Sequence, residues 1–486
     1  MPGTIETDGA RAPERPPGVW SRPATTRVPA FLTDRWQRFS AARARVPLAV
    51  AATVIVWAAA AHTWILTLLR IDRRVPALGW DLVTVWRAEG VFAHGGQPYN
   101  QAATAGRLYL YPPSSLLVLR PIAALSLREV QVLGLVATAA LVWATVMITS
   151  AVLGRRWWGL TSAVVVFALH WAQPVIDELK LENVTVLCAV ALAVFFLLAT
   201  REHFVAAAVF IGLSLAVKPL LLPVVLVFLL ARKPRAFCLA VAIPAVLNAI
   251  AFAVVADPNQ VWAKLPSLLD RSGGGVVLNS AWIGIGDIFG LPDFATILLR
   301  LVTVALVIAG AWWSWRRLAD PGTRLITTSS VLLIGAFLAG TLSEDHFMLV
   351  LVPLAMTAIV PSAPMRWFTG WVGVLWIMGL TPPGSWFGLD SPANQSAFEA
   401  FGMALCLVTV VAILSRRHAV PAQRAAAHAD AGAGAADASA TTAARDAGTA
   451  DAGTGAGTAA AGSGRPAATM RESNGSPPVL DGAPIR

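Results

Sequence analysis

Long apolar segments alternate with short polar connections from residue 46 to residue 414 of the chain. A helix needs about 20 predominantly apolar residues to cross the hydrocarbon core of a bilayer. Segments of about that length recur in regular order, and the pattern predicts about twelve spans. We place them at residues 46–69, 130–153, 157–176, 184–200, 204–217, 219–231, 236–256, 294–315, 325–342, 347–360, 367–380 and 398–414.

Two places depart from this rhythm. Residues 114–125 are apolar but too short to span, so we expect a re-entrant or interfacial segment there. Lys218-Pro219 interrupts a long apolar stretch. Because proline removes a backbone donor and disfavours helix at the residue before it, either two short helices meet at Lys218 or one helix kinks there.

The composition agrees with a membrane protein. Hydrophobic residues make up 56% of the 486 residues and charged residues only 13%, whereas a soluble domain carries roughly a quarter charged residues. In lipid every backbone polar group has to be satisfied internally, which favours helices. The sequence therefore predicts an all-α polytopic membrane protein, a bundle of about twelve transmembrane helices.

Basic residues mark every second connection, which sets the expected orientation. They occur at 155–156, 201, 232–235, 316–324, 366 and 416–417. By the positive-inside rule these connections face the cytoplasm, although the arginines at 70–74 run against the rule locally. The alternate connections, including 72–113, 177–183, 257–292 and 343–346, then face outward, and both termini are cytoplasmic.

The two ends of the chain have a different composition. Residues 1–45 are rich in proline and arginine, and residues 416–486 in alanine, glycine, threonine and aspartate. Neither end can bury enough apolar area to offset its ordering entropy, so we expect disordered tails around one membrane domain at residues 46–415. The net charge of +10 comes from tails and inner connections. It predicts contact with membrane lipid and no nucleic-acid partner, because no basic groove with interleaved aromatics appears.

All three tyrosines, Tyr99, Tyr109 and Tyr111, fall in the connection after the first span, together with Asp81. The apolar positions after Asp81 have helical spacing, so Asp81 begins a helix. Its carboxylate could cap that helix or serve as a general base for an attacking hydroxyl. The tyrosines are candidates for stacking on a sugar or hydrogen-bonding it, with an interfacial aromatic belt as the alternative.

Lys218 lies at the predicted outer end of a span. Charges within spans are costly and usually functional, and a lysine beside a helix break can hold a phosphate as a point charge. The alternative is a side chain that snorkels to the interface. Arg87 and His346 are further cations or donors on the same predicted face.

Glu344, Asp345 and His346 form a row of titratable residues between two apolar spans. Adjacent residues rarely converge on one ion, so we expect no metal site there, but a solvated loop or a histidine bonded to a phosphate or a sugar hydroxyl. The alternating charges of residues 178–182 predict a structural ion-pair loop. The three cysteines lie in or beside apolar spans and predict neither a disulfide framework nor a metal site.

An ordered set of short motifs carries a family resemblance. The set consists of Asp81, Gly96-x-Pro98-Tyr99, Tyr109-x-Tyr111-Pro112-Pro113, Asn183 at the start of a span, Gly212-Leu-Ser-Leu-x-x-Lys218-Pro219, and Asn279-Ser280. In this order the motifs resemble those of bacterial GT-C glycosyltransferases that use polyprenyl-phosphate sugars. The similarity covers roughly residues 81–414, and within the family it is strongest to the mycobacterial arabinofuranosyltransferases.

The resemblance implies an inverting enzyme in the plasma membrane of an actinobacterium. It would take arabinofuranose from decaprenyl-phosphoryl-arabinose at the outer face and add it to a glycan or glycolipid acceptor, the arabinan of arabinogalactan or lipoarabinomannan. Asp81 maps onto the family's catalytic carboxylate, and Lys218 would hold the donor phosphate, with His346 and Arg87 as further ligands. The implied sugar- or acceptor-binding residues are Tyr99, Tyr109, Tyr111, Asn183, Asn279, Glu344 and Asp345. No metal or cofactor is implied, because lysine, arginine or histidine can neutralise a monophosphate.

Three alternatives remain open at this stage. Residues 343–346 differ from the tyrosine-rich segment expected in the arabinosyl branch, and His346 resembles the histidine of polyprenyl-phosphate-mannose-dependent mannosyltransferases. A lipid-linked sugar transporter would also be polytopic, but it should carry charges along the middle of its spans or show repeated halves. A scaffold protein would not require Asp81 at all.

Overall fold

The computed structural model describes residues 46–75, 78–100, 104, 109–269, 279–379 and 392–416. The predicted N-terminal tail, and the predicted C-terminal tail beyond Arg416, lie outside these residues. Within them the regular structure is entirely helical, which confirms the all-α prediction.

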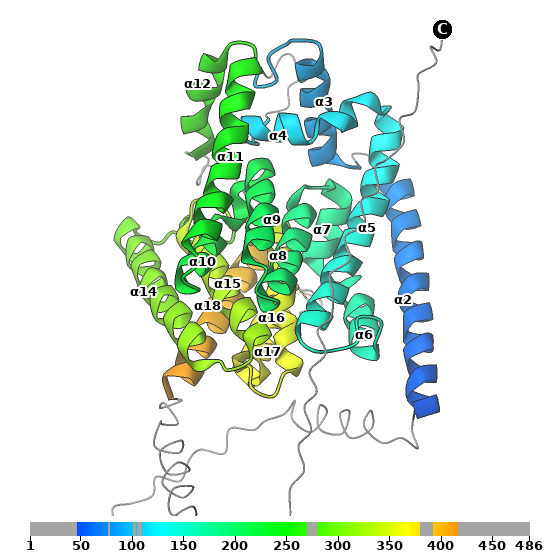
Figure 1. The fold of residues 1–486 in the computed structure, drawn as a ribbon, viewed down its shortest axis with the longest axis vertical. Coiled ribbons are helices and arrows are strands. Elements are labelled where there is room, and N and C mark those ends of the chain that lie inside the picture. Colours follow the sequence, from blue (N-terminus) through cyan, green and yellow to red (C-terminus); the bar gives the residue numbers. More distant parts are fainter. Residues whose placement is uncertain are drawn as a thin grey trace, which may run out of the picture. The chain divides into compact units, whose positions relative to one another are not determined.

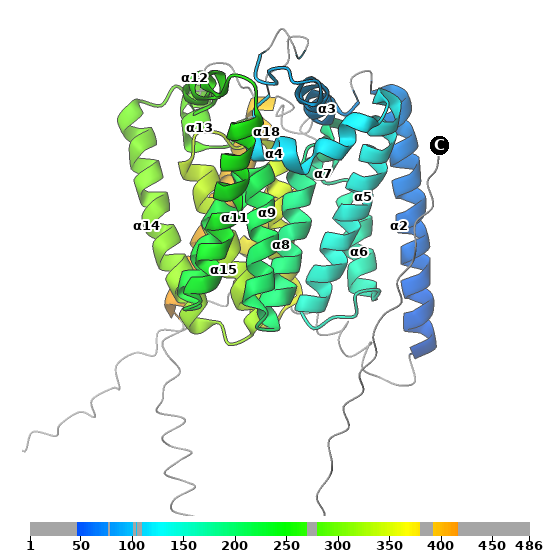
Figure 2. The same ribbon diagram turned by 45° about the horizontal axis from the view of Figure 1, so that its top comes forward.

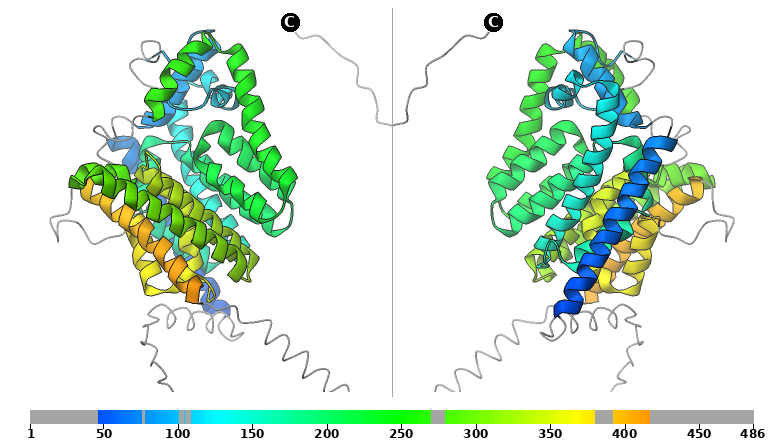
Figure 3. Two further views of the ribbon diagram at one scale, coloured as in Figure 1. Left: turned by 90° about the vertical axis from the view of Figure 1, so that its left-hand side faces the viewer. Right: turned by 90° about the vertical axis from the view of Figure 1, so that its right-hand side faces the viewer.

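In the described part of the chain six helices are long and apolar enough to cross a bilayer: α2 (Val46–Arg74), α5 (Leu127–Val152), α11 (Pro234–Val254), α14 (Asp293–Arg317), α15 (Pro321–Ala339) and α18 (Pro392–Arg416). A bent pair, α6 (Leu160–Leu169) and α7 (Gln173–Leu181), with an angle of 67° between them, forms either a broken seventh span or a re-entrant loop. The helix α2 runs along the side of the bundle (Figure 3). These helices confirm a polytopic membrane protein.

Each of the other predicted spans coincides with a shorter apolar segment. These are α8 (Thr185–Thr200), α9 (Phe204–Val217), the pair η3 (Pro219–Val225) and α10 (Leu226–Leu230), the run η4 (Asp345–Leu351), α16 (Val352–Met356) and η5 (Thr357–Ile359), and α17 (Phe368–Ile377). Their 10–17 residues fall short of the roughly 20 that a full crossing needs. Six or seven segments are therefore full-length spans, and the rest of the predicted twelve are shorter.

Four of the short segments begin or end close to one another in the bundle. The helix α8 begins at Thr185, α9 ends at Val217, η3 begins at Pro219 and η4 begins at Asp345. Irregular backbone is tolerated at membrane depth only where protein buries it or where it lines a polar cavity. These breaks bring polar residues together inside the bundle.

The helix α9 ends as the proline predicts. Lys218 has an extended backbone (φ −148°, ψ 123°), and a new 3-10 helix starts at Pro219. Two short segments meet at Lys218, and this resolves the choice between a break and a kink.

One end of the bundle is covered by shorter elements. The helices α3 (Trp80–Ala93), α4 (Pro113–Val118) and α12 (Pro258–Leu269) lie there (Figures 1 and 2). The predicted short segment at 114–125 forms α4 and the 3-10 helix η2 (Arg120–Ala124). Ser114 Oγ donates a hydrogen bond to Ala216 O at 2.5 Å, so α4 lies across the end of α9. We call this the capped end.

The remaining elements are η6 (Pro364–Arg366), which precedes α17, and α13 (Trp282–Phe289), which packs against α14 and α18. The helices α14, α15, α17 and α18 form the other side of the bundle. Among them α15 is the most deeply buried of the long helices.

Candidate active site

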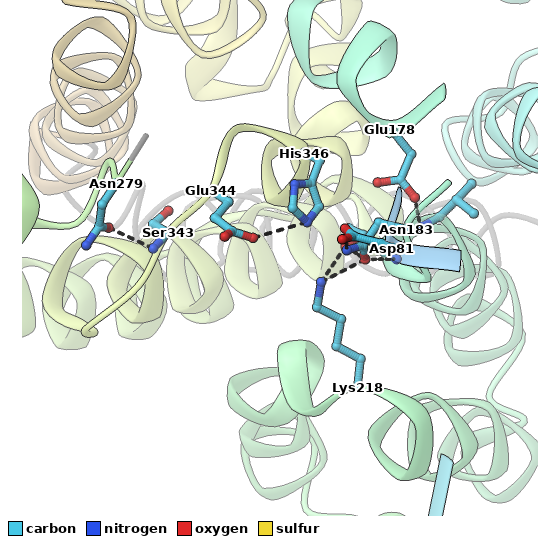
Figure 4. A network of polar contacts seen from close by, with 10 residues as sticks. Asp81, Glu178, Asn183, Lys218, Asn279, Ser343, Glu344 and His346 are labelled. Atoms are coloured by element: carbon cyan, nitrogen blue, oxygen red, sulfur yellow. Dashed lines mark hydrogen bonds and ion pairs between the residues drawn. The ribbon is translucent and has the colours of Figure 1, made fainter. Parts of the chain in front are cut away.

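Asp81 lies in the first turn of α3. The residue that caps this helix is Gly79, with a left-handed backbone (φ 69°) and no side-chain cap bond. The capping alternative for Asp81 is therefore wrong. Instead Asn183 Nδ2 donates a hydrogen bond to Asp81 Oδ2 at 2.6 Å, which points the carboxylate into the bundle (Figure 4).

Asn183 also binds the predicted phosphate ligand. Its Oδ1 accepts hydrogen bonds from Lys218 Nζ at 2.9 Å and from Thr185 N and Oγ1, both at 2.9 Å. These donors assign the amide oxygen to the Lys218 side and the amide nitrogen to Asp81. A single side chain thus links the acid on α3 to the cation between α9 and η3 (Figure 4).

Lys218 keeps one donor beyond these contacts. Its Nζ also donates to Thr185 Oγ1 at 2.8 Å and lies 4.2 Å from the centre of the Phe347 ring. An ammonium group carries three N–H donors, and Asn183 and Thr185 engage two of them. The third makes no hydrogen bond among the described residues and lies on the side chain that also contacts the Phe347 ring.

Glu344 and His346 lie close to Asp81 and Lys218 (Figure 4). His346 Nε2 is 3.5 Å from Glu344 Oε2. Burial raises the pKa of Glu344 above its ordinary value; Lys218 opposes this shift, and Asp81 and Asp345 add to it. The carboxyl of Glu344 therefore lies in the electrostatic field of Asp81 and Lys218.

Asp345 belongs to a separate cluster, although it is next in sequence. Gln395 Nε2 donates to Asp345 Oδ2 at 2.6 Å, and Ser280 Oγ donates to Glu399 Oε2 at 2.7 Å on the same helix as Gln395. No described contact brings Asp345 to Lys218.

Asn279 holds the loop that carries Glu344. Its Oδ1 accepts hydrogen bonds from Ser343 N at 2.9 Å and Ala281 N at 3.1 Å, and its Nδ2 donates to Thr341 O at 2.9 Å. These bonds give Asn279 a positioning role, with Glu344 directly beyond Ser343 (Figure 4).

The three tyrosines separate into two roles. Tyr99 and Tyr109 are buried; the Tyr99 hydroxyl donates to Tyr111 O at 2.9 Å, and the Tyr109 hydroxyl bonds Ser115 Oγ. They form a small core with α3 and α4 and do not make an aromatic belt.

Tyr111 is the tyrosine that faces the site. Burial raises its pKa well above the ordinary value, and the carboxylates of Asp81, Glu178 and Glu344 raise it further. Of the three rings, Tyr111 is the one close to the acids of the site.

Arg87 is not part of this arrangement. It lies six residues after Asp81 on α3, and at about 100° per residue that is roughly 120° around the helix from Asp81. Among the described residues Arg87 forms no ion pair with an acid of the site.

Glu178 is the site residue that our sequence analysis missed. Its Oε1 accepts a hydrogen bond from Val186 N at 2.9 Å, and its side chain is fully buried beside Asp81 (Figure 4). The signal was present, because Pro174, Val175, Glu178 and Leu179 form one buried face of α7. The predicted ion-pair loop at 178–182 was wrong, since Lys180 pairs with Asp177 at 3.2 Å instead.

Glu182 is buried between two glycines beside the site. A Cβ at Gly79 would lie 2.6 Å from Glu182 Oε2, and one at Gly134 would lie 2.4 Å from it. Glu182 has a left-handed backbone (φ 52°), which an L-residue adopts only at a cost. Burial raises the pKa of this carboxyl to about 8, with a smaller contribution from Asp72, so the group is mostly uncharged at neutral pH.

No group of three or more histidine, cysteine, aspartate or glutamate side chains that could hold a metal ion occurs among the described residues. The site consists instead of one half-buried lysine, three nearby carboxyl groups, an amide and a histidine.

Comparison with known proteins gives a consistent result. The model of glycosyltransferase family 87 matches residues 109–341. An α-(1→3)-arabinofuranosyltransferase of Mycobacterium tuberculosis is 29% identical over 352 residues, which cover 70% of this chain and 79% of the relative. The chain resembles the α-(1→3)-arabinofuranosyltransferases.

Two further arabinofuranosyltransferases of the same name support this likeness. That of Mycolicibacterium smegmatis is 28% identical, over 73% of this chain and 85% of its own. That of Corynebacterium glutamicum is 23% identical, over 61% of this chain and 72% of its own. No solved structure matches the chain significantly. These matches support a membrane glycosyltransferase.

Proposed function

We propose that the protein is an inverting arabinofuranosyltransferase. It takes arabinofuranose from decaprenyl-phosphoryl-arabinose and adds it to cell-wall arabinan at the outer face of the plasma membrane. The observation that carries this proposal is the hydrogen-bonded chain Asp81–Asn183–Lys218. It holds a carboxylate and an ammonium group side by side, as transfer from a phosphate-linked sugar requires.

Each group has one part in the reaction. Asp81 accepts the proton of the acceptor hydroxyl as that oxygen attacks the anomeric carbon of the donor sugar. The bond from that carbon to the phosphate oxygen breaks, and the phosphate leaves with the bonding electron pair. The third N–H of Lys218 binds the departing oxygen, because charge-assisted hydrogen bonds are the stronger ones. The geometry favours Tyr111 and Glu344 over Tyr99, Tyr109 and Asp345 as sugar contacts.

A mannose donor is the second candidate. The observation in its favour is His346, which lies 3.5 Å from Glu344 and resembles the histidine of polyprenyl-phosphate-mannose-dependent enzymes. The same base and phosphate ligand would serve this sugar, so the fold and the mechanism would not change.

The test uses reconstituted protein with each donor in turn. Decaprenyl-phosphoryl-arabinose and polyprenyl-phosphoryl-mannose are each incubated with a short arabinan or mannan acceptor, with and without a chelator. We expect arabinose transfer that survives chelation and falls by at least roughly a hundredfold in Asp81→Asn, because the base is lost.

The matched control is Asp293→Asn, which removes an exposed carboxylate from the first turn of α14 and should keep full activity. Mannose transfer by the wild type would move the sugar to the second candidate. A folded protein that transfers neither sugar would contradict the proposal and favour a lipid-linked sugar transporter.

A further inference from the structure

A basic cavity lies at the end of the bundle opposite the capped end. Its walls are residues 202–206, from the turn after α8 and the first turn of α9, and residues 232–236, from the turn after α10 and the first turn of α11. Its volume is about 710 Å³. The helix α8 starts beside Asn183 and is 16 residues long, so at 1.5 Å per residue this cavity is about 24 Å from the candidate active site.

Two helices point their N-termini at this cavity. The helices α9 and α11 run in the same direction and pack closely side by side (Figures 1 and 2). A Cβ at Gly212 of α9 would lie 2.9 Å from the side chain of Ile243 on α11, which shows how near the two helices approach. Their partial positive charges therefore lie next to one another instead of cancelling.

The residues at these two helix starts increase the positive charge. A helix start favours Ser, Thr, Asp or Asn as its cap, and acidic groups in its first turn. Here the caps are His203 and Lys233, neither helix start has a side-chain cap bond, and neither first turn holds an acid. Arg232 and Arg235 flank Lys233 on the same wall.

The protein itself neutralises little of this charge. Among the described residues Arg232 and Arg235 make no ion pair or side-chain hydrogen bond, and Lys233 Nζ lies 4.8 Å from the centre of the Phe204 ring. Glu202 also lines the cavity, but its carboxylate forms no ion pair with these cations. The cavity therefore has one acidic side chain, three basic side chains and two helix N-termini, and its net charge is positive.

Two other arginines at this end of the bundle contact aromatic rings of their own helix, α14. Arg316 lies over the ring of Trp312 at 4.3 Å, and Arg317 lies over Trp313 and donates to Leu414 O and Ser415 O. A topogenic role alone would account for exposed arginines, but not for an open cavity in which uncapped helix starts and unpaired cations converge.

We propose that this cavity binds the phosphate of an anionic membrane phospholipid. A phosphate would accept hydrogen bonds from the first-turn amides and bridge the guanidinium groups of both arginines. A lipid is favoured over a free anion because exposed apolar side chains continue from the cavity along the span, beginning with Val205 on α9 and Leu229 on α10. These side chains offer a surface for an acyl chain. The inference does not depend on the proposed glycosyl transfer.

The experiment is a lipid competition on the purified full-length protein. Equal amounts of phosphatidylglycerol and phosphatidylcholine are added in neutral detergent, and native mass spectrometry counts the lipids that stay bound. We expect a preference for phosphatidylglycerol of roughly tenfold or more, since three basic residues attract an anionic headgroup and phosphatidylcholine has no net charge. The variant Arg232→Gln/Lys233→Gln/Arg235→Gln should lose that preference.

The control variant Arg155→Gln/Arg156→Gln/Arg316→Gln removes the same charge from other turns and should keep the preference. Equal loss in both triple variants, or no preference in the wild type, would overturn the proposal. Thermal unfolding verifies that each variant folds. If the triple variant does not fold, Arg235→Gln alone is tested, and it should lose a smaller part of the preference for phosphatidylglycerol. If inorganic phosphate at equal concentration stabilises the protein as much as phosphatidylglycerol does, the site takes a free anion and the lipid assignment is wrong.

Discussion

At the scale of single residues, the distance between Asp81 and Asn183 depends on residues that do not contact Asp81. Glu182 occupies the gap that Gly79 and Gly134 leave, and it directly precedes Asn183. Gly79 N donates to Lys180 O at 2.9 Å, so the start of α3 is fastened to the end of α7. The small size of the two glycines therefore sets how closely Asp81 approaches Asn183.

We expect Gly134→Ala to reduce kcat by at least roughly tenfold, with a smaller change in KM, because small displacements of positioned groups are costly. The new Cβ would lie 2.4 Å from both Glu182 Oε2 and Leu82 Cδ2, and Leu82 follows Asp81. Glu182→Gln should keep activity, since the native carboxyl is mostly uncharged. The measurement is the steady-state rate of sugar transfer. The control is Gly90→Ala on α3, where no atom lies within 4 Å of the new Cβ; an equal loss there would contradict the positioning role.

Glu89 gives a second residue-scale prediction, on pH. Its carboxyl is buried among α3 and the tyrosines, and burial raises its pKa to about 8, opposed by Arg120. The folded state therefore binds more protons than the unfolded state between pH 4.5 and about 8. In that window the free energy of unfolding should fall as pH rises, by at most about 1.4 kcal/mol per unit.

The measurement is thermal unfolding in detergent across that pH range. Glu89→Gln cannot ionise and should reduce the slope of the profile, while Glu182, whose pKa is also raised to about 8, keeps a slope of its own. Glu129→Gln is the control, because Glu129 is exposed and its carboxylate accepts a hydrogen bond from Ser126 N at 2.8 Å. A wild-type profile and a Glu89→Gln profile of the same slope would show that Glu89 does not carry the effect.

At the scale of helices, close approach holds the α17–α18 pair together. A Cβ at Gly373 would lie 2.7 Å from Cys406 Sγ and 2.8 Å from Gly402 O, and one at Gly402 would lie 2.8 Å from Gly373 O. In membranes such small residues let backbones pack by van der Waals contact, without a hydrophobic driving force.

We expect Gly373→Ala to destabilise the fold by roughly 1–3 kcal/mol, because overpacking forces backbone shifts. A lower midpoint of thermal unfolding in detergent is the readout. Gly90→Ala again serves as the control and should leave the midpoint unchanged or raise it, since alanine is the better helix former. A Gly373→Ala protein as stable as the wild type would mean that the two helices can separate without cost.

At the scale of the whole molecule, the distribution of basic residues predicts how the protein is oriented in the membrane. The basic turns lie at the end opposite Asp81, so the positive-inside rule places the candidate active site outside. We expect a cysteine at His94 to react with a membrane-impermeant maleimide on intact cells, and a cysteine at Arg155 to react only after permeabilisation.

Both substitutions are made in a Cys188→Ser/Cys238→Ser/Cys406→Ser background, because Cys238 is exposed. The parent without cysteines is the control. Labelling at Arg155 but not at His94 in intact cells would invert the topology and place sugar transfer on the cytoplasmic side.

Much of this architecture follows from the sequence alone. Apolar segments long enough to span the bilayer form helices, because in lipid a helix satisfies all its backbone N–H and C=O groups within one segment. The Lys218-Pro219 break follows from proline geometry, and the helix after Asp81 follows from apolar spacing. The residue types at Asp81, Asn183 and Lys218 were likewise readable as candidates.

Only the tertiary structure decided which candidates meet. Asn183 is 102 residues from Asp81 and 35 from Lys218, so no local pattern could reveal that its amide joins them. Residues next to one another in sequence also have different surroundings. The side chains of Glu344 and His346 lie toward Lys218, whereas that of Asp345 lies toward α18. The sequence determines which segments enter the membrane, because the free energy of transfer from water to lipid depends on the residues of each segment alone. The contacts among side chains depend on how the segments pack, and packing is a property of the whole bundle.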